Sequence, residues 1–225
     1  MKLSRLNDMV KHAPLHAHSG TLHGLFISFE GIDGSGKSTQ TKLLKERYPN
    51  AILTREPGGS AGAEEIRALL LTGDPDRWSA ETEILLFTAA RRDHLETTIT
   101  PALAAGKTVI CDRFADSTRV YQGATRGTLR GAVDTLHDVM IGREPDLTFI
   151  IDMDPKVALE RGLARRSGED RFEDMGLAFQ ETLRHGFLAL ARTNPDRCVL
   201  IDGNRDPIEV AAEIAVHVAN RMFAA

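Results

Sequence analysis

Short, nearly continuous apolar runs alternate along the chain with longer segments in which apolar residues recur every three or four positions. Runs of the first kind are typical of strands buried on both faces, and we expect strands at residues 25–30, 51–54, 108–111, 147–152 and 198–202. The second pattern predicts helices at residues 37–48, 63–71, 81–105, 128–141, 155–166, 177–193 and 207–222. Strands that alternate with helices predict an α/β fold, with three layers in the order α/β/α around a five-stranded parallel sheet.

The composition fits an ordinary globular protein, because 42% of the 225 residues are hydrophobic and 27% are charged. The net charge of −4 argues against a protein that holds a nucleic acid polymer by bulk positive charge, although a local cationic pocket remains compatible with it. Every apolar run is shorter than the roughly 18 residues that a membrane span requires. We therefore expect neither a nucleic acid polymer nor a membrane as a partner.

The first 24 residues differ from the rest of the chain. They hold four of the eight histidines and lack the apolar segment of a secretory signal. We interpret residues 1–24 as a flexible N-terminal extension, with a metal site as the alternative, and residues 25–225 as one domain. Cys111 and Cys198 lie in apolar runs and are expected to be buried thiols, which favours a reducing, cytoplasmic compartment.

Residues 31–38 match the pattern G-x-x-x-x-G-K-[ST] between a predicted strand and a predicted helix. Glycines let successive backbone N–H groups point at phosphate oxygens, and the start of the following helix presents its positive dipole end to the same anion. Lys37 would add a charge at the β- and γ-phosphates, and the Ser38 hydroxyl would be a ligand for Mg²⁺. The alternative is a glycine turn with a solvated lysine. A loop of this kind indicates a nucleoside triphosphate but not the reaction.

Arginine side chains lie at the predicted strand ends where a kinase would bind a second, anionic substrate. Asp112 and Arg113 end the third predicted strand, and Arg55 follows the second strand in a Pro-Gly-Gly turn. Because the carboxyl ends of parallel strands open into the ligand crevice, Asp112 could hold a metal, whereas Arg113 and Arg55 could hold phosphates. Surface ion pairs are the alternative for each of them.

Two further segments carry candidate chemistry. Phe87 and Arg91 are four residues apart on a predicted helix, so they share a face that could stack on and hydrogen-bond a planar base. A core phenylalanine beside a solvated arginine is the alternative. Residues 161–173 are dense in charges of both signs and could form a mobile lid that bears arginines, or an ordinary solvated turn between helices.

The sequence resembles bacterial thymidylate kinase from about residue 25 to the C-terminus. The motifs that carry the resemblance are FEGIDGSGKST (29–39), TREPGG (54–59), LLFTAAR (85–91), DRFADSTRVYQG (112–123) and PDLTFIIDMDP (145–155). The resemblance implies a P-loop kinase fold with a helical lid, transfer of a phosphoryl group from ATP to dTMP for dTTP biosynthesis, Mg²⁺ as cofactor, and a homodimer packed through helices on one sheet face.

Family membership also implies roles for individual residues. The implied ATP-binding residues are Gly31, Ile32, Asp33, Gly34, Ser35, Gly36, Lys37, Ser38, Thr39, Arg161, Arg166 and Arg171. The implied dTMP-binding residues are Arg55, Phe87, Arg91, Arg113, Ser117, Thr118, Tyr121 and Gln122, with Phe87 stacked on thymine, Arg91 at its O4 edge and Tyr121 near the sugar 2′ position. Catalysis is expected from Lys37, Arg113, Asp33 and Arg165, and metal binding from Ser38 and Asp112.

Family members place a catalytic arginine either in the phosphate loop or in the lid. Gly34 occupies the loop position in this sequence, and Arg165, Arg166 and Arg171 lie in the predicted lid, so the chain resembles the lid-arginine branch and we favour Arg165. The role of Arg119 stays open. A kinase for another nucleotide or nucleoside, a switch that slowly hydrolyses a nucleoside triphosphate, and an inactive binding module are the alternative functions.

Overall fold

The computed structural model describes residues 24–74, 77–124, 129–165 and 176–224, with every side chain in these ranges except those of residues 124, 163–165, 223 and 224. Five parallel strands form its sheet in the order β2-β3-β1-β4-β5. The strands are β1 (Phe26–Glu30), β2 (Ile52–Arg55), β3 (Val109–Asp112), β4 (Leu147–Asp152) and β5 (Cys198–Asp202). Their positions agree with the predicted strands to within one residue at each end.

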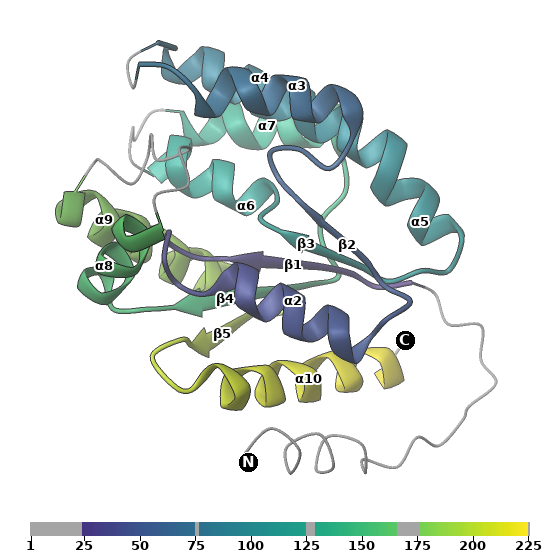
Figure 1. Cartoon of the computed structure of the whole chain (residues 1–225). Helices are drawn as coiled ribbons and strands as arrows, with labels where there is room; N and C mark the ends of the chain where they lie inside the picture. The colour runs from purple at the N-terminus through teal and green to yellow at the C-terminus, as the bar shows by residue number, and fades with distance from the viewer. Residues whose placement is uncertain (1–23, 75–76, 125–128, 166–175, 225) are drawn as a thin grey trace.

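Helices cover both faces of the sheet, as Figure 1 shows. They are α2 (Lys37–Arg47), α3 (Ala61–Leu71), α4 (Ala80–His94), α5 (Thr100–Ala104), α6 (Ala115–Thr118), α7 (Arg130–Met140), α8 (Pro155–Arg165), α9 (Gly176–Thr193) and α10 (Pro207–Ala224). The three-layer α/β/α architecture predicted from the alternating pattern is therefore confirmed. No helix among the described residues is long and apolar enough to cross a membrane.

The two faces of β1 differ in chemistry because alternate side chains point to opposite sides of a strand. Ile27 and Phe29 pack in an apolar cluster with residues of α2 and α10. On the other face Phe26 packs with Phe114, whereas Ser28 and Glu30 are polar and fully buried. The face of β1 that packs on Phe114, the second residue after β3, therefore carries two buried polar side chains.

Two wider helical turns are the main local features that the periodicity does not predict. The helix expected at residues 81–105 contains the π-helical segment η1 (Leu95–Ile99) between α4 and α5, next to Pro101. A proline inside a helix removes one N–H donor and crowds the preceding turn, and a wider turn accommodates both effects. The second segment, η2 (Arg119–Ala124), follows α6, and the sequence pattern predicted neither of these two helical elements.

Candidate active site

The glycine loop between β1 and α2 is closed by its own lysine. Lys37 Nζ donates hydrogen bonds to the carbonyl oxygens of Gly31 at 3.0 Å and Ile32 at 2.8 Å. Gly31, Gly34 and Gly36 have φ angles of 139°, 81° and 99°, in the region that favours glycine. The loop therefore has the curled backbone that a phosphate-binding loop requires, at the N-terminus of an 11-residue helix.

Residue 34 has no room for a side chain. A Cβ atom at Gly34 would lie 1.9 Å from the carbonyl oxygen of Ala158, because α8 packs directly on the loop. An arginine at residue 34 would displace α8. The phosphate loop of this chain therefore cannot carry an arginine at the position where one branch of the family that the sequence resembles has its catalytic arginine.

Arg113 joins the phosphate loop to the elements beyond β3. Its Nη2 donates to Asp33 Oδ1 and, at 3.1 Å, to the hydroxyl of Tyr121, while Nη1 donates to Ser117 Oγ at 2.9 Å. Tyr121 in turn donates to Asp33 Oδ2 at 2.7 Å. Arg113 has a φ of 70°, a backbone conformation that costs a non-glycine residue free energy and that clusters at functional sites.

The charges of the loop are tuned by their neighbours. Burial and repulsion from Arg113 lower the pKa of Lys37 to about 8, although Asp33, Asp112 and Glu30 partly offset the effect. Burial by itself would raise the pKa of Asp33, but the attraction of Arg113 and Lys37 outweighs it and lowers that pKa to about 2. At neutral pH the loop therefore presents a cationic Lys37 beside an ion pair of Asp33 with Arg113.

A cavity of about 260 Å³ opens beside the phosphate loop, at the carboxyl ends of β1, β2 and β3. All eight residues predicted to bind dTMP line it, together with six of the predicted loop and metal residues. The dTMP residues are Arg55, Phe87, Arg91, Arg113, Ser117, Thr118, Tyr121 and Gln122. The loop and metal residues are Asp33, Gly34, Gly36, Lys37, Ser38 and Asp112. The structure thus brings all the predicted dTMP residues and part of the predicted phosphate-loop residues to one cavity.

The part of this cavity formed by α4 and α6 holds directional polar groups. Arg91 donates from Nη2 to Thr118 Oγ1 at 3.0 Å and to the carbonyl oxygen of Phe114 at 3.2 Å. Gln122 donates to Glu83 at 3.3 Å, whereas its buried amide oxygen has no hydrogen-bond partner among the described residues. Such a group can accept an N–H of a planar ligand.

At the mouth of the cavity, Arg55 is half exposed and forms an ion pair with Glu64 at 3.1 Å. A ligand phosphate at this position would compete with a solvated ion pair, which contributes little by itself.

Ser38 and Asp112, the two predicted metal ligands, are in contact. The Ser38 hydroxyl donates to Asp112 Oδ2 at 2.5 Å, across the gap between α2 and the end of β3. Hydroxyl and carboxylate oxygens beside a phosphate loop are the donors that Mg²⁺ prefers, so the residues present fit this ion.

The lid prediction is only partly covered by the described residues. Arg161 on α8 directs Nη1 toward Met153 Sδ at 3.8 Å and does not line the cavity. Arg165 is the last residue of α8, but its side chain lies outside the described residues, as do Arg166 and Arg171. The extension at 1–24 also falls outside them, apart from its last residue. Of the other loop residues, Ser35 is buried and Thr39 is exposed on the first turn of α2.

Glu30 is a site residue that the sequence interpretation missed. It ends β1 without solvent exposure and accepts hydrogen bonds from Phe114 N at 2.7 Å and Ser117 Oγ at 2.6 Å, so it ties the segment after β3 to the start of the phosphate loop. Burial and repulsion from Asp116 raise its pKa to about 7. A carboxylate at the end of an otherwise apolar strand was the available signal. Glu56, Pro57, Arg67, Leu71 and Phe114 also line the cavity and were not predicted.

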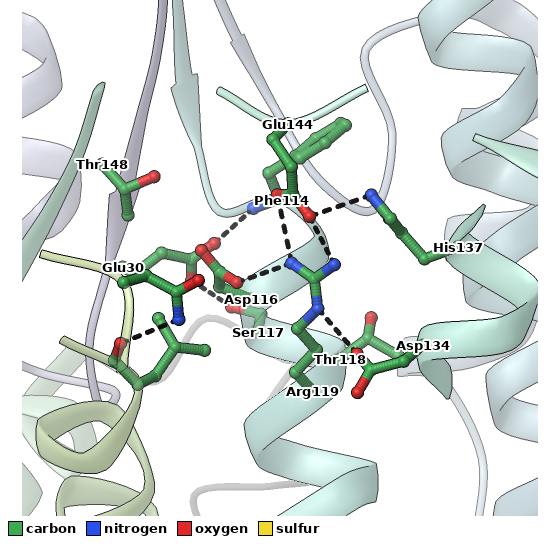
Figure 2. A network of polar contacts seen from close by, with 12 residues as sticks. Glu30, Phe114, Asp116, Ser117, Thr118, Arg119, Asp134, His137, Glu144 and Thr148 are labelled. Atoms are coloured by element: carbon green, nitrogen blue, oxygen red, sulfur yellow. Dashed lines mark hydrogen bonds and ion pairs between the residues drawn. The ribbon is translucent and has the colours of Figure 1, made fainter. Parts of the chain in front are cut away.

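Arg119 does not line the cavity. Figure 2 shows that its side chain instead contacts carboxylates around the end of α6. Its guanidinium binds Asp116 at 2.8 Å, Asp134 of α7 at 3.0 Å and Glu144 at 2.5 Å. Arg197 binds the same Asp116 at 2.5 Å. Two arginines thus neutralise a carboxylate whose side chain is 2% exposed, which fixes the helix that carries Ser117 and Thr118.

A parallel sheet with a phosphate loop after its first strand and an arginine-lined cavity beside that loop defines a P-loop kinase for a small anionic acceptor. A sequence model described as thymidylate kinase matches residues 29–214. The chain belongs to the thymidylate kinase family.

Named relatives and a solved structure agree with this assignment. The thymidylate kinase of Dinoroseobacter shibae is 70% identical over 202 residues, which cover 88% of this chain and 98% of that protein. The thymidylate kinase of Jannaschia sp. is 67% identical over 202 residues, 88% of this chain and 97% of that protein. The crystal structure of thymidylate kinase from Ehrlichia chaffeensis matches with a TM-score of 0.70 and 39% identity, and the match covers 87% of this chain and 98% of that chain.

The raised pKa of Glu30 predicts a specific pH dependence of stability. The folded state holds its proton up to about pH 7, whereas the carboxyl of an unfolded chain releases it near 4.5, so Glu30 loses its stabilising contribution as pH rises through this window. In Glu30→Gln this loss is absent. Between pH 5.5 and 7 the free energy of unfolding of the wild type should therefore fall by about 1.5 kcal/mol relative to the variant, because the slope of about 1.4 kcal/mol per pH unit halves as the pH reaches the folded-state pKa.

Urea unfolding at several pH values measures this difference. The exposed Glu65→Gln variant on α3 is the control, and its difference from the wild type should stay flat. A flat difference for Glu30→Gln as well would contradict the assigned titration.

Proposed function

We propose that the cavity beside the phosphate loop is the site at which this chain transfers the γ-phosphoryl group of ATP to dTMP, giving dTDP and ADP for dTTP biosynthesis. The observation that carries the proposal is the bridge made by Arg113, which contacts Asp33 of the phosphate loop and Ser117 and Tyr121 of the acceptor side. One guanidinium thus reaches both the donor loop and the acceptor cavity.

The acceptor would lie with its phosphate toward β2 and β3 and its base toward α4. Arg113 and Arg55 would bind the phosphate, with Asp33 and Tyr121 near the sugar. Phe87 would stack on thymine, and Arg91 would donate to its O4. Thr118 and Gln122 complete the lining, and the amide oxygen of Gln122 would accept the N3–H of the base.

The donor would be held by backbone N–H groups of residues 31–36 and by Lys37, which would exchange its bonds to Gly31 and Ile32 for phosphate oxygens. Ser38 and Asp112 would hold Mg²⁺, which supplies charge neutralisation between the phosphates when bound. Since residue 34 cannot carry a side chain, the remaining catalytic cation would come from the C-terminal end of α8 or the segment that follows it, and we assign it to Arg165. Arg161, Arg166 and Arg171 would assist ATP binding.

The reaction requires positioning more than proton transfer. The acceptor phosphate is already anionic, so no strong general base is needed, and catalysis rests on alignment and on charge stabilisation by Lys37, Arg113 and the lid arginine. We assign one catalytic domain to residues 25–225, with residues 1–24 as an extension outside it. The two buried free cysteines support a reducing, cytoplasmic location.

A panel of acceptors tests the assignment. In a coupled assay of ADP release, the wild type should prefer dTMP over dCMP, dGMP and dAMP, because Arg91 and Gln122 match the O4 and N3–H of a thymine stacked on Phe87. The preference over dUMP should be the smallest of the panel, because uracil has the same edge and lacks only the 5-methyl group. Lys37→Ala is the negative control and should lose on the order of 10²–10³ in turnover. A preference for another acceptor would contradict the substrate assignment, and turnover without any acceptor would indicate a hydrolytic switch.

We also propose a homodimer that packs through α4 and α7. These helices contact each other (Figure 1). Leu85 and Ala89 on α4 and Val139 and Met140 on α7 are exposed apolar residues, and Leu136 beside them is half-buried. Leu85 is 57% exposed and Val139 is 70% exposed. Residues three and four positions apart share one face of a helix, and an exposed apolar face of this kind is typical of an interface between two copies.

Light scattering after gel filtration tests the dimer. The wild type should elute at twice the chain mass, and Val139→Asp should give the monomer, because the substitution places a charge in the centre of this face. Val216→Asp on α10, where the valine is 58% exposed, is the matched control and should remain dimeric. A monomeric wild type, or a dimeric Val139→Asp, would contradict the proposed interface.

A further inference from the structure

A buried series of hydrogen-bonded side chains runs from Arg91 through Glu56 and His94 to Thr54. These contacts are separate from those that Arg91 makes with α6. Glu56 follows β2 and accepts a hydrogen bond from Arg91 Nε at 2.7 Å through Oε2. The other carboxylate oxygen, Oε1, lies 3.1 Å from Nδ1 of His94, and Nε2 of that histidine lies 2.7 Å from Thr54 Oγ1. The side chains of Arg91 and Glu56 are each 4% exposed, and that of His94 is fully buried.

The series is complete with one tautomer of His94. If Nδ1–H of His94 donates to Glu56, then Nε2 of His94 accepts the hydroxyl proton of Thr54. Both ring nitrogens of His94 then have a hydrogen-bond partner. Both oxygens of Glu56 are then held, one by Arg91 and one by His94. A carboxylate fixed at both oxygens cannot rotate, so it defines the orientation of the guanidinium that it binds.

The glycine-rich turn after β2 is shaped around this series. A Cβ atom on Gly59 would lie 2.4 Å from both Nε2 of His94 and Oγ1 of Thr54. Gly59 also has a φ of 87°, where only glycine is unstrained. The turn of the TREPGG motif therefore closes directly over the contact between His94 and Thr54, which keeps that contact away from solvent.

The contacts of Arg91 leave one nitrogen for a ligand. Nε is bound to Glu56, and Nη2 is bound to Phe114 O and Thr118 Oγ1. Nη1 has no hydrogen bond within the part of the chain that the structure describes, and Arg91 lines the cavity. Since a guanidinium is planar and rigid, fixing Nε and Nη2 also fixes the direction of the Nη1 donors.

We propose that Glu56, His94 and Thr54 are positioning residues that orient Arg91 so that it distinguishes a carbonyl from an amine at position 4 of the acceptor pyrimidine. The inference rests on the proposed function, in which Arg91 meets that edge of the base. A carbonyl accepts from the fixed Nη1 donors, whereas the exocyclic amine of cytosine would place donor against donor. A buried donor left without an acceptor costs binding free energy, so a fixed Arg91 rejects dCMP more strongly than a mobile one.

The variants Glu56→Gln, His94→Gln and Thr54→Val test this role through the ratio of kcat/KM for dTMP to kcat/KM for dCMP. The ratio should fall by about tenfold or more in Glu56→Gln, which loses a buried charge-assisted bond to Arg91. It should fall less in His94→Gln and least in Thr54→Val, which is nearly isosteric and acts through two intervening residues. The loss should reside in the KM for dTMP, with the KM for ATP unchanged.

Glu96→Gln is the matched control, because Glu96 also pairs with an arginine of α4, Arg92, but both partners are about half exposed. Its ratio should equal that of the wild type. The melting temperature of each variant separates a structural effect from a positioning effect.

If the variants melt at lower temperatures but keep the wild-type ratio, the three residues are merely structural and the proposal is wrong. If Glu56→Gln does not fold, the proposal is tested with the other two variants. Lower dTMP-to-dCMP ratios in His94→Gln and Thr54→Val would support it, and wild-type ratios in both would contradict it. A wild type without any preference for dTMP over dCMP would overturn the proposed substrate itself, which is a separate outcome.

Discussion

The guanidinium of Arg113 is the contact on which the arrangement of the site depends. It is the residue after β3, its side chain is 17% exposed, and it binds the phosphate loop through Asp33 and the acceptor side through Ser117 and Tyr121. Its strained backbone shows that the turn is shaped to deliver this side chain, since a relaxed conformation would point it elsewhere. Under the proposed function, this one rigid planar group would align both substrates, as in-line transfer requires.

Two buried polar groups keep that turn in place. Glu30 binds Phe114 N and Ser117 from the end of β1, and Asp116 is held by two arginines on the far side of α6. Glu30 and Asp116 both lie on the side of β1 that carries α6. The opposite face of β1 is apolar and packs on α2 and α10. Burying paired charges contributes little net stability, so we interpret this polar face as the means by which the sheet positions α6.

Much of this arrangement follows from the sequence, because strands buried on both faces and the glycine loop have strong local signatures. The eight residues assigned to dTMP were found to line one cavity, but that grouping came from motif resemblance and from the rule that strand ends meet at one edge. Glu30, Glu56 and His94 were missed because each acts through a partner more than 30 residues away, which leaves no local pattern. The π-helical segments were missed because their widened turns depend on Pro101 and on packing rather than on periodicity.

The turnover of Arg113→Lys tests the central role of the guanidinium most directly. Lysine keeps the positive charge but cannot hold Asp33, Ser117 and Tyr121 at once with a planar fork. If Arg113 joins the two sites, kcat for dTMP phosphorylation should fall on the order of 10²-fold while the protein still folds and binds ATP. A variant that retains turnover within a factor of two of the wild type would show that charge alone suffices, and would contradict this account.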